Sequence, residues 1–374
     1  MRVEFFRHNL EESDIKSCAG VLRSVFLTTG PVTAEFEKKF AQYVGLKETV
    51  GVNSCTAALH LSLLALGIGP GDEVVTTPMT FIATATSIMH AGAIPVFVDV
   101  EESTGLIDVA KVEEAITPRT KAIMPVHPYG SMVDMKRLRD IADNHGLKIV
   151  EDSAHCIEGE RDGIRPGHLG DAACFSFYAT KNLTAGEGGA VATNNRELAE
   201  KVRVLRLHGM SKDAAGRHTG HYQHWDMISL GWKYNMDDVH ASLLVGQLDS
   251  LDRYSQRRRT LWERYNGGLA DIPLIRIPET PGESARHLYT IWVDPTRRDD
   301  MLHRIQDKDI GVAVNYRAIH TLTYFRDVLG LRPHDFPVAR HIGESTISLP
   351  LYPKLKDAEV NYVVESIKEI AARI

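Results

Sequence analysis

The sequence predicts an α/β protein in which a mostly parallel sheet is sandwiched by helices in a large domain, followed by a smaller α+β domain. The length of 374 residues accommodates two or three domains at roughly 150 residues each. Between about residues 33 and 210, short apolar segments alternate with helical patterns, which is typical of βαβ units. This alternation stops near residue 240. We therefore place the large domain at residues 15–240 and the small domain at 241–374, and expect residues 1–14 to pack on the small domain.

The first predicted helix of the large domain carries Phe36, Phe40 and Tyr43 on one face and ends before Gly45. Strands separated by helices run parallel, and a parallel sheet needs cover on both faces. The predicted strands lie at 49–53, 73–76, 94–99, 121–126 and 148–151, with helices at 56–66, 82–90, 109–116 and 134–145 between them.

The second half has a different pattern. A long charged helix is predicted at 241–269, and its Arg257–Arg259 run is interpreted as a solvated face. Proline-rich turns follow, and then strands at 287–293 and 311–316 with a helix between them. A terminal helix is expected at 357–373.

Composition excludes several classes of protein. Lys and Arg number 43 against 49 Asp and Glu, and the resulting net charge of −6 argues against nucleic-acid binding. Apolar segments are shorter than the ~18 residues of a membrane span, and the N-terminus lacks a signal-peptide core. The four cysteines form no C-x-x-C pair, so we expect no disulfide framework and no metal site. We expect a cytoplasmic enzyme.

One candidate site is Asn53–Thr56, between a predicted strand and a buried helix. Free backbone N–H groups at a helix N-terminus favour a phosphate, although the same residues would also serve as a plain helix cap. On this segment alone both interpretations stay open. The Gly-rich fingerprints of dinucleotide-binding and P-loop proteins are absent from the chain.

Two further candidates follow neighbouring predicted strands. Asp152 ends one strand, where a carboxylate is either a solvated turn residue or the partner of a ring nitrogen, and His155 lies one turn further on. Lys181 follows an apolar strand and precedes a glycine-rich segment, and a desolvated lysine readily forms Schiff bases. Pyridoxal phosphate needs a lysine, a carboxylate at its ring nitrogen and a phosphate cup, which Ser54–Thr56 could supply.

Several motifs in order along nearly the whole chain resemble the DegT-type nucleotide-sugar aminotransferases, which are fold type I pyridoxal phosphate enzymes. They include Asn-Ser-Cys-Thr-Ala-Ala-Leu-His (53–60), Thr-Phe-Ile-Ala-Thr (80–84), Glu-Asp-Ser-Ala-His (151–155), Phe-Ser-Phe-Tyr-Ala-Thr-Lys-Asn-Leu-Thr (175–184), Gly-Trp-Lys-Tyr-Asn-Met (231–236) and Val-Asn-Tyr-Arg-Ala-Ile-His (314–320). Taken alone, the segment 231–236 would be only a loop.

The resemblance implies four roles around the cofactor ring. Lys181 matches the Schiff-base lysine and Asp152 the partner of the pyridinium nitrogen. Phe81 matches the aromatic residue stacked on the ring. His155 stands where Gln is usual, beside the phenolic oxygen, and so adds a titratable group.

The resemblance also implies how the cofactor phosphate is held. Thr56 and Ser176 match phosphate ligands, next to Ser54 in the cup, and Cys55 stands where Gly is usual. Asn235 matches a phosphate ligand donated by the other subunit. A homodimer with two shared active sites is therefore implied.

The implied reaction transfers an amino group from L-glutamate, with release of 2-oxoglutarate and with pyridoxamine phosphate as the intermediate cofactor form. The acceptor that we favour, by similarity of motifs, is a UDP-linked 4-keto hexose aminated at C4. Arg317 and His320 are candidates for contacting the diphosphate or the sugar, with surface-loop roles as the alternative.

Other functions stay open at this stage. The acceptor could be a dTDP- or GDP-linked keto sugar aminated at C3 or C4, and a non-catalytic pyridoxal phosphate-binding regulator is a different class. A sugar 3-dehydratase of this fold would carry His in place of Lys181. A cysteine desulfurase would need a cysteine on a late loop, whereas every cysteine here precedes residue 175.

Overall fold

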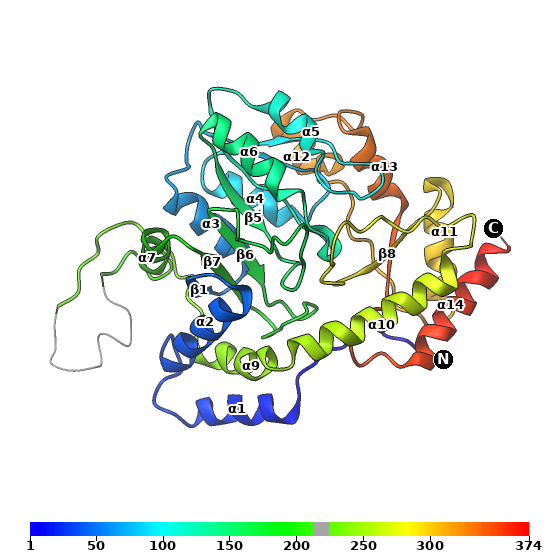
Figure 1. The fold of residues 1–374 in the computed structure, drawn as a ribbon, viewed down its shortest axis with the longest axis horizontal. Helices are drawn as coiled ribbons and strands as arrows, with labels where there is room; N and C mark the ends of the chain where they lie inside the picture. The colour runs from blue at the N-terminus through cyan, green and yellow to red at the C-terminus, as the bar shows by residue number, and fades with distance from the viewer. Residues whose placement is uncertain (212–223, 374) are drawn as a thin grey trace.

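The computed structural model describes residues 1–211 and 224–373 (Figure 1). Its centre is a seven-stranded sheet in the order β1-β7-β6-β5-β4-β2-β3. The pairs β2–β3, β2–β4, β4–β5 and β5–β6 are parallel, and β7 is antiparallel to both β1 and β6. The prediction of a mostly parallel sheet is confirmed. The strands are β1 (Glu48–Val52), β2 (Glu73–Thr76), β3 (Ile94–Phe97), β4 (Thr120–Ile123), β5 (Lys148–Asp152), β6 (Ala172–Ser176) and β7 (Gly189–Thr193).

Both faces of this sheet are buried, as its apolar strands require. In β6, Ala172 and Cys174 belong to one apolar cluster, whereas Ala173 and Phe175 belong to another on the opposite face. The first face is covered by α3 (Cys55–Ala65), α4 (Ile82–His90) and α7 (Arg196–Leu205). The second is covered by α2 (Pro31–Val44), α5 (Val109–Val112), α6 (Met135–His145) and α9 (Asp238–Leu248).

The prediction of one long helix at 241–269 is wrong in one respect, because the structure has two helices in this region. α9 ends at Leu248 and α10 (Leu251–Leu269) begins after Asp249 and Ser250, whose short polar side chains compete with helical hydrogen bonding. α9 packs against α1 (Glu12–Leu22) and α2, whereas α10 runs across to α14 (Asp357–Ala371) (Figure 1).

The C-terminal part contains a two-stranded antiparallel sheet of β8 (Tyr289–Trp292) and β9 (Thr346–Leu349). The strand predicted at 311–316 is wrong: within it Ala313 makes a single bridge to Ser348, and the preceding Ile310 makes one to Val3. Asn315 and Tyr316, at the end of this segment, line a cavity described below instead of continuing a strand. The remaining helices are α11 (Pro295–Gln306), α12 (Thr323–Leu329) and α13 (Pro337–Ser345), with short 3-10 turns at Glu113–Ala115, Pro128–Gly130 and Ile319–Thr321.

The N-terminus joins this C-terminal part. Val3 is buried in the same apolar cluster as Leu261, Tyr265 and Ile310. Within the described residues, no helix has both the length and the apolar character that crossing a membrane requires.

Candidate active site

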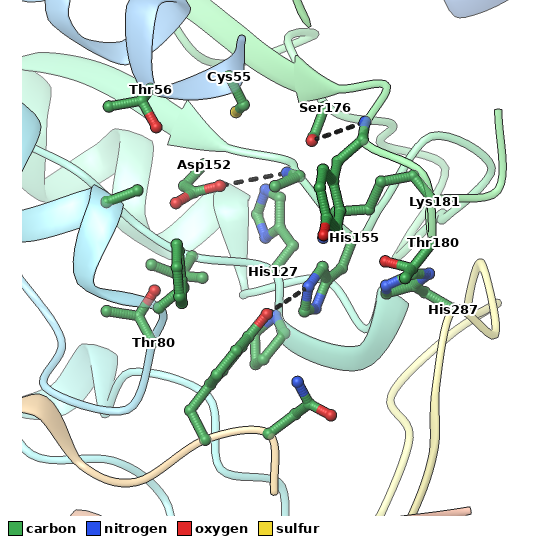
Figure 2. Close-up of a pocket in the computed structure, with 18 of the residues that line it drawn as sticks. Cys55, Thr56, Thr80, His127, Asp152, His155, Ser176, Thr180, Lys181 and His287 are labelled. Carbon is green, nitrogen blue, oxygen red and sulfur yellow. Dashed lines mark hydrogen bonds between the residues drawn. The ribbon is translucent and has the colours of Figure 1, made fainter. Parts of the chain in front are cut away.

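The strand ends of the large sheet open into a cavity of about 530 Å³ (Figure 2). Parallel strands place their carboxyl ends at one edge, where ligands bind in open α/β sheets. The cavity is bounded by the ends of β5 and β6 and by the N-terminal ends of α3 and α4. Eight of the residues singled out in the sequence line it: Ser54, Cys55, Thr56, Phe81, Asp152, His155, Ser176 and Lys181.

The first wall of the cavity is the turn from β1 into α3. Ser54 is the cap residue of α3, and its hydroxyl accepts a hydrogen bond from the backbone N–H of Ala57 at 3.1 Å. The backbone N–H groups of Cys55 and Thr56 belong to the first turn, which has no intrahelical acceptors for them. The interpretation as a helix cap is confirmed for Ser54, whereas the anion site at the next two amides stays a prediction, with Cys55 and Thr56 lining the cavity.

A close backbone approach shapes this turn. A Cβ atom added at Gly189, the first residue of β7, would lie 2.4 Å from the carbonyl carbon of Ser54 and 2.5 Å from the amide nitrogen of Cys55. Such distances are shorter than real Cβ contacts, so only glycine allows β7 to run against the turn.

Asp152 ends β5 and is buried. Its Oδ2 accepts a hydrogen bond from the Thr84 hydroxyl at 2.7 Å, and its Oδ1 accepts one from the Ala154 N–H at 3.2 Å. The Thr84 hydroxyl lies 2.7 Å from the Thr80 hydroxyl. The two hydroxyls therefore form a chain that ends on the Asp152 carboxylate and holds it in place. Burial raises the pKa of Asp152, and the bonds from Thr84 and Ala154 and the proximity of Lys181 oppose that shift.

Lys181 follows β6 in a turn in which its backbone N–H bonds to the Tyr178 carbonyl at 2.9 Å. Burial lowers the pKa of Lys181 to about 8, although the nearby Asp152 carboxylate opposes this shift. Among the described residues, the amine has no hydrogen bond or ion pair with a side chain. The result is an unpaired amine of lowered basicity in the same cavity as a fixed carboxylate, a combination typical of a nucleophilic lysine.

His155 lies between the lysine and the C-terminal part of the chain. Its Nδ1 accepts a hydrogen bond from the Tyr129 backbone N–H at 3.2 Å. Its Nε2 lies 2.9 Å from the Tyr316 hydroxyl, a contact marked by the dashed line at His155 in Figure 2. The His155 and His287 rings are 4.3 Å apart between centroids. Phe81, at the start of α4, packs near the Tyr316 ring with a centroid distance of 5.7 Å and remains 53% exposed.

Three of the predicted site residues do not line this cavity. Asn235 donates a hydrogen bond to the Thr29 hydroxyl of its own chain at 2.7 Å. Arg317 points to the surface. His320 is fully buried, bonds through Nε2 to the Pro333 carbonyl at 3.2 Å and packs against Phe336. Its enclosure leaves no surface for a direct ligand contact in this structure.

Other cavity residues were missed in the sequence. Tyr316 and Thr80 lie inside motifs quoted above, so their motifs were recognised without a role for these side chains. His287 and Leu288 come from a segment with no sequence signal for a site. They reach the cavity only because β8 brings the C-terminal part of the chain to its edge.

The residues present fit pyridoxal phosphate. An anion site at a helix N-terminus, a carboxylate and an amine open onto one cavity, and an exposed aromatic ring stands beside them. In the described part of the chain, no group of three or more His, Cys, Asp or Glu side chains is arranged to hold a metal ion.

Comparisons with known proteins agree with this geometry. The Spore coat polysaccharide biosynthesis protein SpsC of Bacillus subtilis (strain 168) is 44% identical over 367 residues, which cover 96% of this chain and 94% of that protein. The PMP-form structure of Spr1654 from Streptococcus pneumoniae superposes with a TM-score of 0.94 at 34% identity and full coverage of both chains. The structure of Helicobacter pylori PseC, an aminotransferase involved in the biosynthesis of pseudoaminic acid, superposes with a TM-score of 0.93 at 28% identity, also over the whole of both chains.

The family match is equally extensive, since it spans residues 8–368. The fold is that of the fold type I pyridoxal phosphate aminotransferases, as the resemblance in the sequence predicted. This chain belongs to the DegT/DnrJ/EryC1/StrS aminotransferase family.

Proposed function

We propose that this sugar aminotransferase uses pyridoxal phosphate to move an amino group from L-glutamate to a nucleotide-linked keto sugar, with a UDP-linked 4-keto hexose aminated at C4 as the acceptor. The observation that carries the proposal is the convergence of Lys181, Asp152 and the α3 N-terminus on one cavity. SpsC is named for polysaccharide biosynthesis and PseC for pseudoaminic acid biosynthesis, which supports an amino sugar as the product.

In this proposal the cofactor phosphate lies at the N-terminus of α3, held by the amides of Cys55 and Thr56 and by the hydroxyls of Thr56 and Ser176. Asp152 pairs with the ring nitrogen, and Phe81 covers one face of the ring. When bound, the cofactor supplies an electron sink for the carbanion that transamination requires.

Lys181 then acts at its Nζ atom in two ways. Its neutral amine would hold the cofactor, and the same amine would serve as the base and acid that moves a proton at this position. The lowered pKa of about 8 matters because about a tenth of the amines would be neutral at pH 7, against roughly one in three thousand at the usual lysine pKa.

A second copy of the chain completes the proposed site. Asn235 lies outside the cavity of its own chain, and its amide is half-buried. We assign it to the phosphate of the partner subunit's cofactor, which makes the active enzyme a homodimer with shared sites. Arg317 is exposed and cationic, and we assign it to the substrate diphosphate.

The test is a substrate panel. Purified protein loaded with pyridoxal phosphate and given L-glutamate should release a single equivalent of 2-oxoglutarate per site, and should form it continuously only when a keto sugar is added. UDP-4-keto hexoses should be preferred over dTDP- and GDP-linked ones, and mass spectrometry and NMR of the product should place the amine at C4. Cofactor binding without turnover on any sugar would contradict the proposal and favour a regulator instead.

A further inference from the structure

The environment of His155 determines its tautomer. The ring is 8% exposed and lies between His287 and Tyr316. Both ring nitrogens have partners within the protein: the backbone N–H of Tyr129 at Nδ1 and the hydroxyl of Tyr316 at Nε2.

The partner at Nδ1 is a backbone amide, which can only donate. Nδ1 must therefore accept, and a neutral imidazole that accepts at Nδ1 carries its hydrogen on Nε2. Tyr129 cannot easily turn this amide away. It has a left-handed φ of 60°, and its carbonyl accepts a hydrogen bond from the His287 backbone at 3.1 Å. The following Gly130 has φ 102°, and an added Cβ there would lie 2.8 Å from the Arg286 amide nitrogen.

The direction of the second hydrogen bond follows. Because the His155 hydrogen is on Nε2, this atom donates and the Tyr316 oxygen accepts, over 2.9 Å. The hydrogen of the Tyr316 hydroxyl is then not used by His155. Tyr316 lines the cavity together with Lys181 and Asp152, so a ligand there can accept this hydrogen in competition with the Asn315 side chain, whose buried Oδ1 has no partner among the described residues.

We propose that His155 is a positioning residue held as the Nε2–H tautomer, and that it turns the Tyr316 hydroxyl so that Tyr316 donates a hydrogen bond to an oxygen atom of the bound ligand. The assignment of that oxygen rests on the proposed function. It belongs either to the phenolic group of the cofactor or to the carbonyl of the keto sugar. The tautomer itself is independent of the proposed function.

This inference changes the role that the sequence assigns to His155. By resemblance, the residue at this position lies beside the phenolic oxygen and adds a titratable group. Here both ring nitrogens have partners in the protein, so the proposal adds Tyr316 as a donor to the ligand beside His155.

The charged and titratable groups around the ring oppose its protonation. Burial and the proximity of Lys181 hold the pKa of His155 well below its usual value, and burial and His155 do the same for the pKa of His287. Tyr316 faces Nε2 as a neutral phenol, because burial and the Asp152 carboxylate raise its pKa. His155 should therefore keep one tautomer across the pH range in which free histidine titrates.

The first test uses the protein without cofactor. Two-bond ¹H–¹⁵N NMR correlations of ¹⁵N-histidine-labelled protein, with the His155 signals assigned by their loss in His155→Gln, should show a protonated Nε2 and a bare Nδ1 from pH 5.5 to about pH 8. An Nδ1–H tautomer, or a titration near the usual histidine pKa, would overturn the proposal whatever the enzyme's substrate is.

The second test is a double-mutant cycle. Tyr316→Phe and His155→Leu should each lower either the affinity for pyridoxal phosphate or kcat/KM for the keto sugar by roughly 3- to 10-fold, as expected for one lost hydrogen bond. The loss in the double variant should be no larger than the loss in either single variant. His155→Gln should recover most of the loss, since a side-chain amide can also donate to the Tyr316 oxygen. Tyr352→Phe is the matched control, because it removes a buried hydroxyl from the core of the C-terminal part.

Two measurements identify the ligand oxygen. If it belongs to the cofactor, Tyr316→Phe should weaken the binding of pyridoxal phosphate to apo-protein. If it belongs to the sugar, cofactor binding should be unchanged and kcat/KM for the keto sugar should fall while the glutamate half-reaction keeps its rate. Unchanged values in both, or losses that add in the double variant, would refute the role of Tyr316.

Discussion

At the scale of single residues, the proposed chemistry depends on burial acting on two charged groups. Lys181 becomes less basic because it is desolvated, and Asp152 stays fixed because Thr84 and Ala154 donate to it. Lys181 and Asp152 were both predicted from the sequence. Each follows or ends one of two neighbouring parallel strands, and such strands bring their carboxyl ends to the same edge of the sheet. Thr84 was not predicted to act on Asp152, because the two are 68 residues apart and only the packing of α4 joins them.

Removing the amine should abolish transamination while leaving the fold and the phosphate site. We expect Lys181→Ala to lower kcat by at least roughly 10²- to 10⁴-fold, the range of a lost acid–base group, and to keep measurable affinity for pyridoxal phosphate. Steady-state assays and cofactor titration measure the two effects. Lys136→Ala, at an exposed site on α6, is the control and should change neither. Turnover retained in Lys181→Ala would disprove the assignment.

The lowered pKa of Lys181 predicts how apo-protein reacts with pyridoxal phosphate as the pH changes. Only the neutral amine is nucleophilic, and its fraction rises with pH and reaches one half at the pKa. The rate at which the protein-bound chromophore appears should therefore rise with pH and level off above about pH 8, the pKa of this amine. Stopped-flow absorbance gives this profile. A rate still climbing steeply at pH 10 would mean that the amine is not desolvated.

At the scale of elements, the proposed anion site depends on two segments lying unusually close together. β7 runs antiparallel between β1 and β6, and its first residue contacts the turn that begins α3. The sequence indicated the phosphate turn but not this contact, because a glycine-rich segment does not reveal which backbone it approaches. The sequence also missed the break between α9 and α10, since apolar periodicity continues through Leu248 and Leu251 while the two helices pack on different parts of the molecule.

Gly189→Ala tests this contact. The added methyl group would collide with the Ser54–Cys55 backbone, so we expect a loss of about 1–3 kcal/mol in the free energy of unfolding and weaker binding of pyridoxal phosphate. Gly20→Ala is the matched control. Gly20 lies in α1 with no atom within 4 Å of an added Cβ, so its replacement should stabilise the protein by about 0.5–1 kcal/mol. Urea unfolding measures the stability of each variant, and cofactor titration measures its affinity for pyridoxal phosphate. A Gly189→Ala protein with unchanged stability and unchanged affinity would contradict the described turn.

At the scale of the whole molecule, one chain brings together most of the predicted site but leaves Asn235 outside the cavity. A sequence shows that such a residue resembles a family motif, but the placement of a second subunit depends on a surface formed by the entire fold. The homodimer with shared sites therefore stays a prediction.

Mixing two inactive variants tests this prediction. Lys181→Ala lacks the amine, and Asn235→Ala lacks the phosphate contact that we assign to the partner. If sites are shared, a mixed dimer keeps one complete site, and refolding the two variants together should restore about a quarter of the wild-type activity. Each variant refolded alone is the control. No gain of activity in a mixture whose mixed dimers are verified by mass spectrometry would argue that each chain uses its own Asn235.

The central claim is that the Lys181 amine bonds to a pyridoxal cofactor in the cavity that also contains Asp152. Reduction of the loaded enzyme with borohydride, followed by peptide mass mapping, tests it most directly. The pyridoxyl group should be found on Lys181 and on no other lysine, and L-glutamate added before reduction should prevent the labelling. A label on a different lysine, or none on a protein that has bound the cofactor, would contradict the claim.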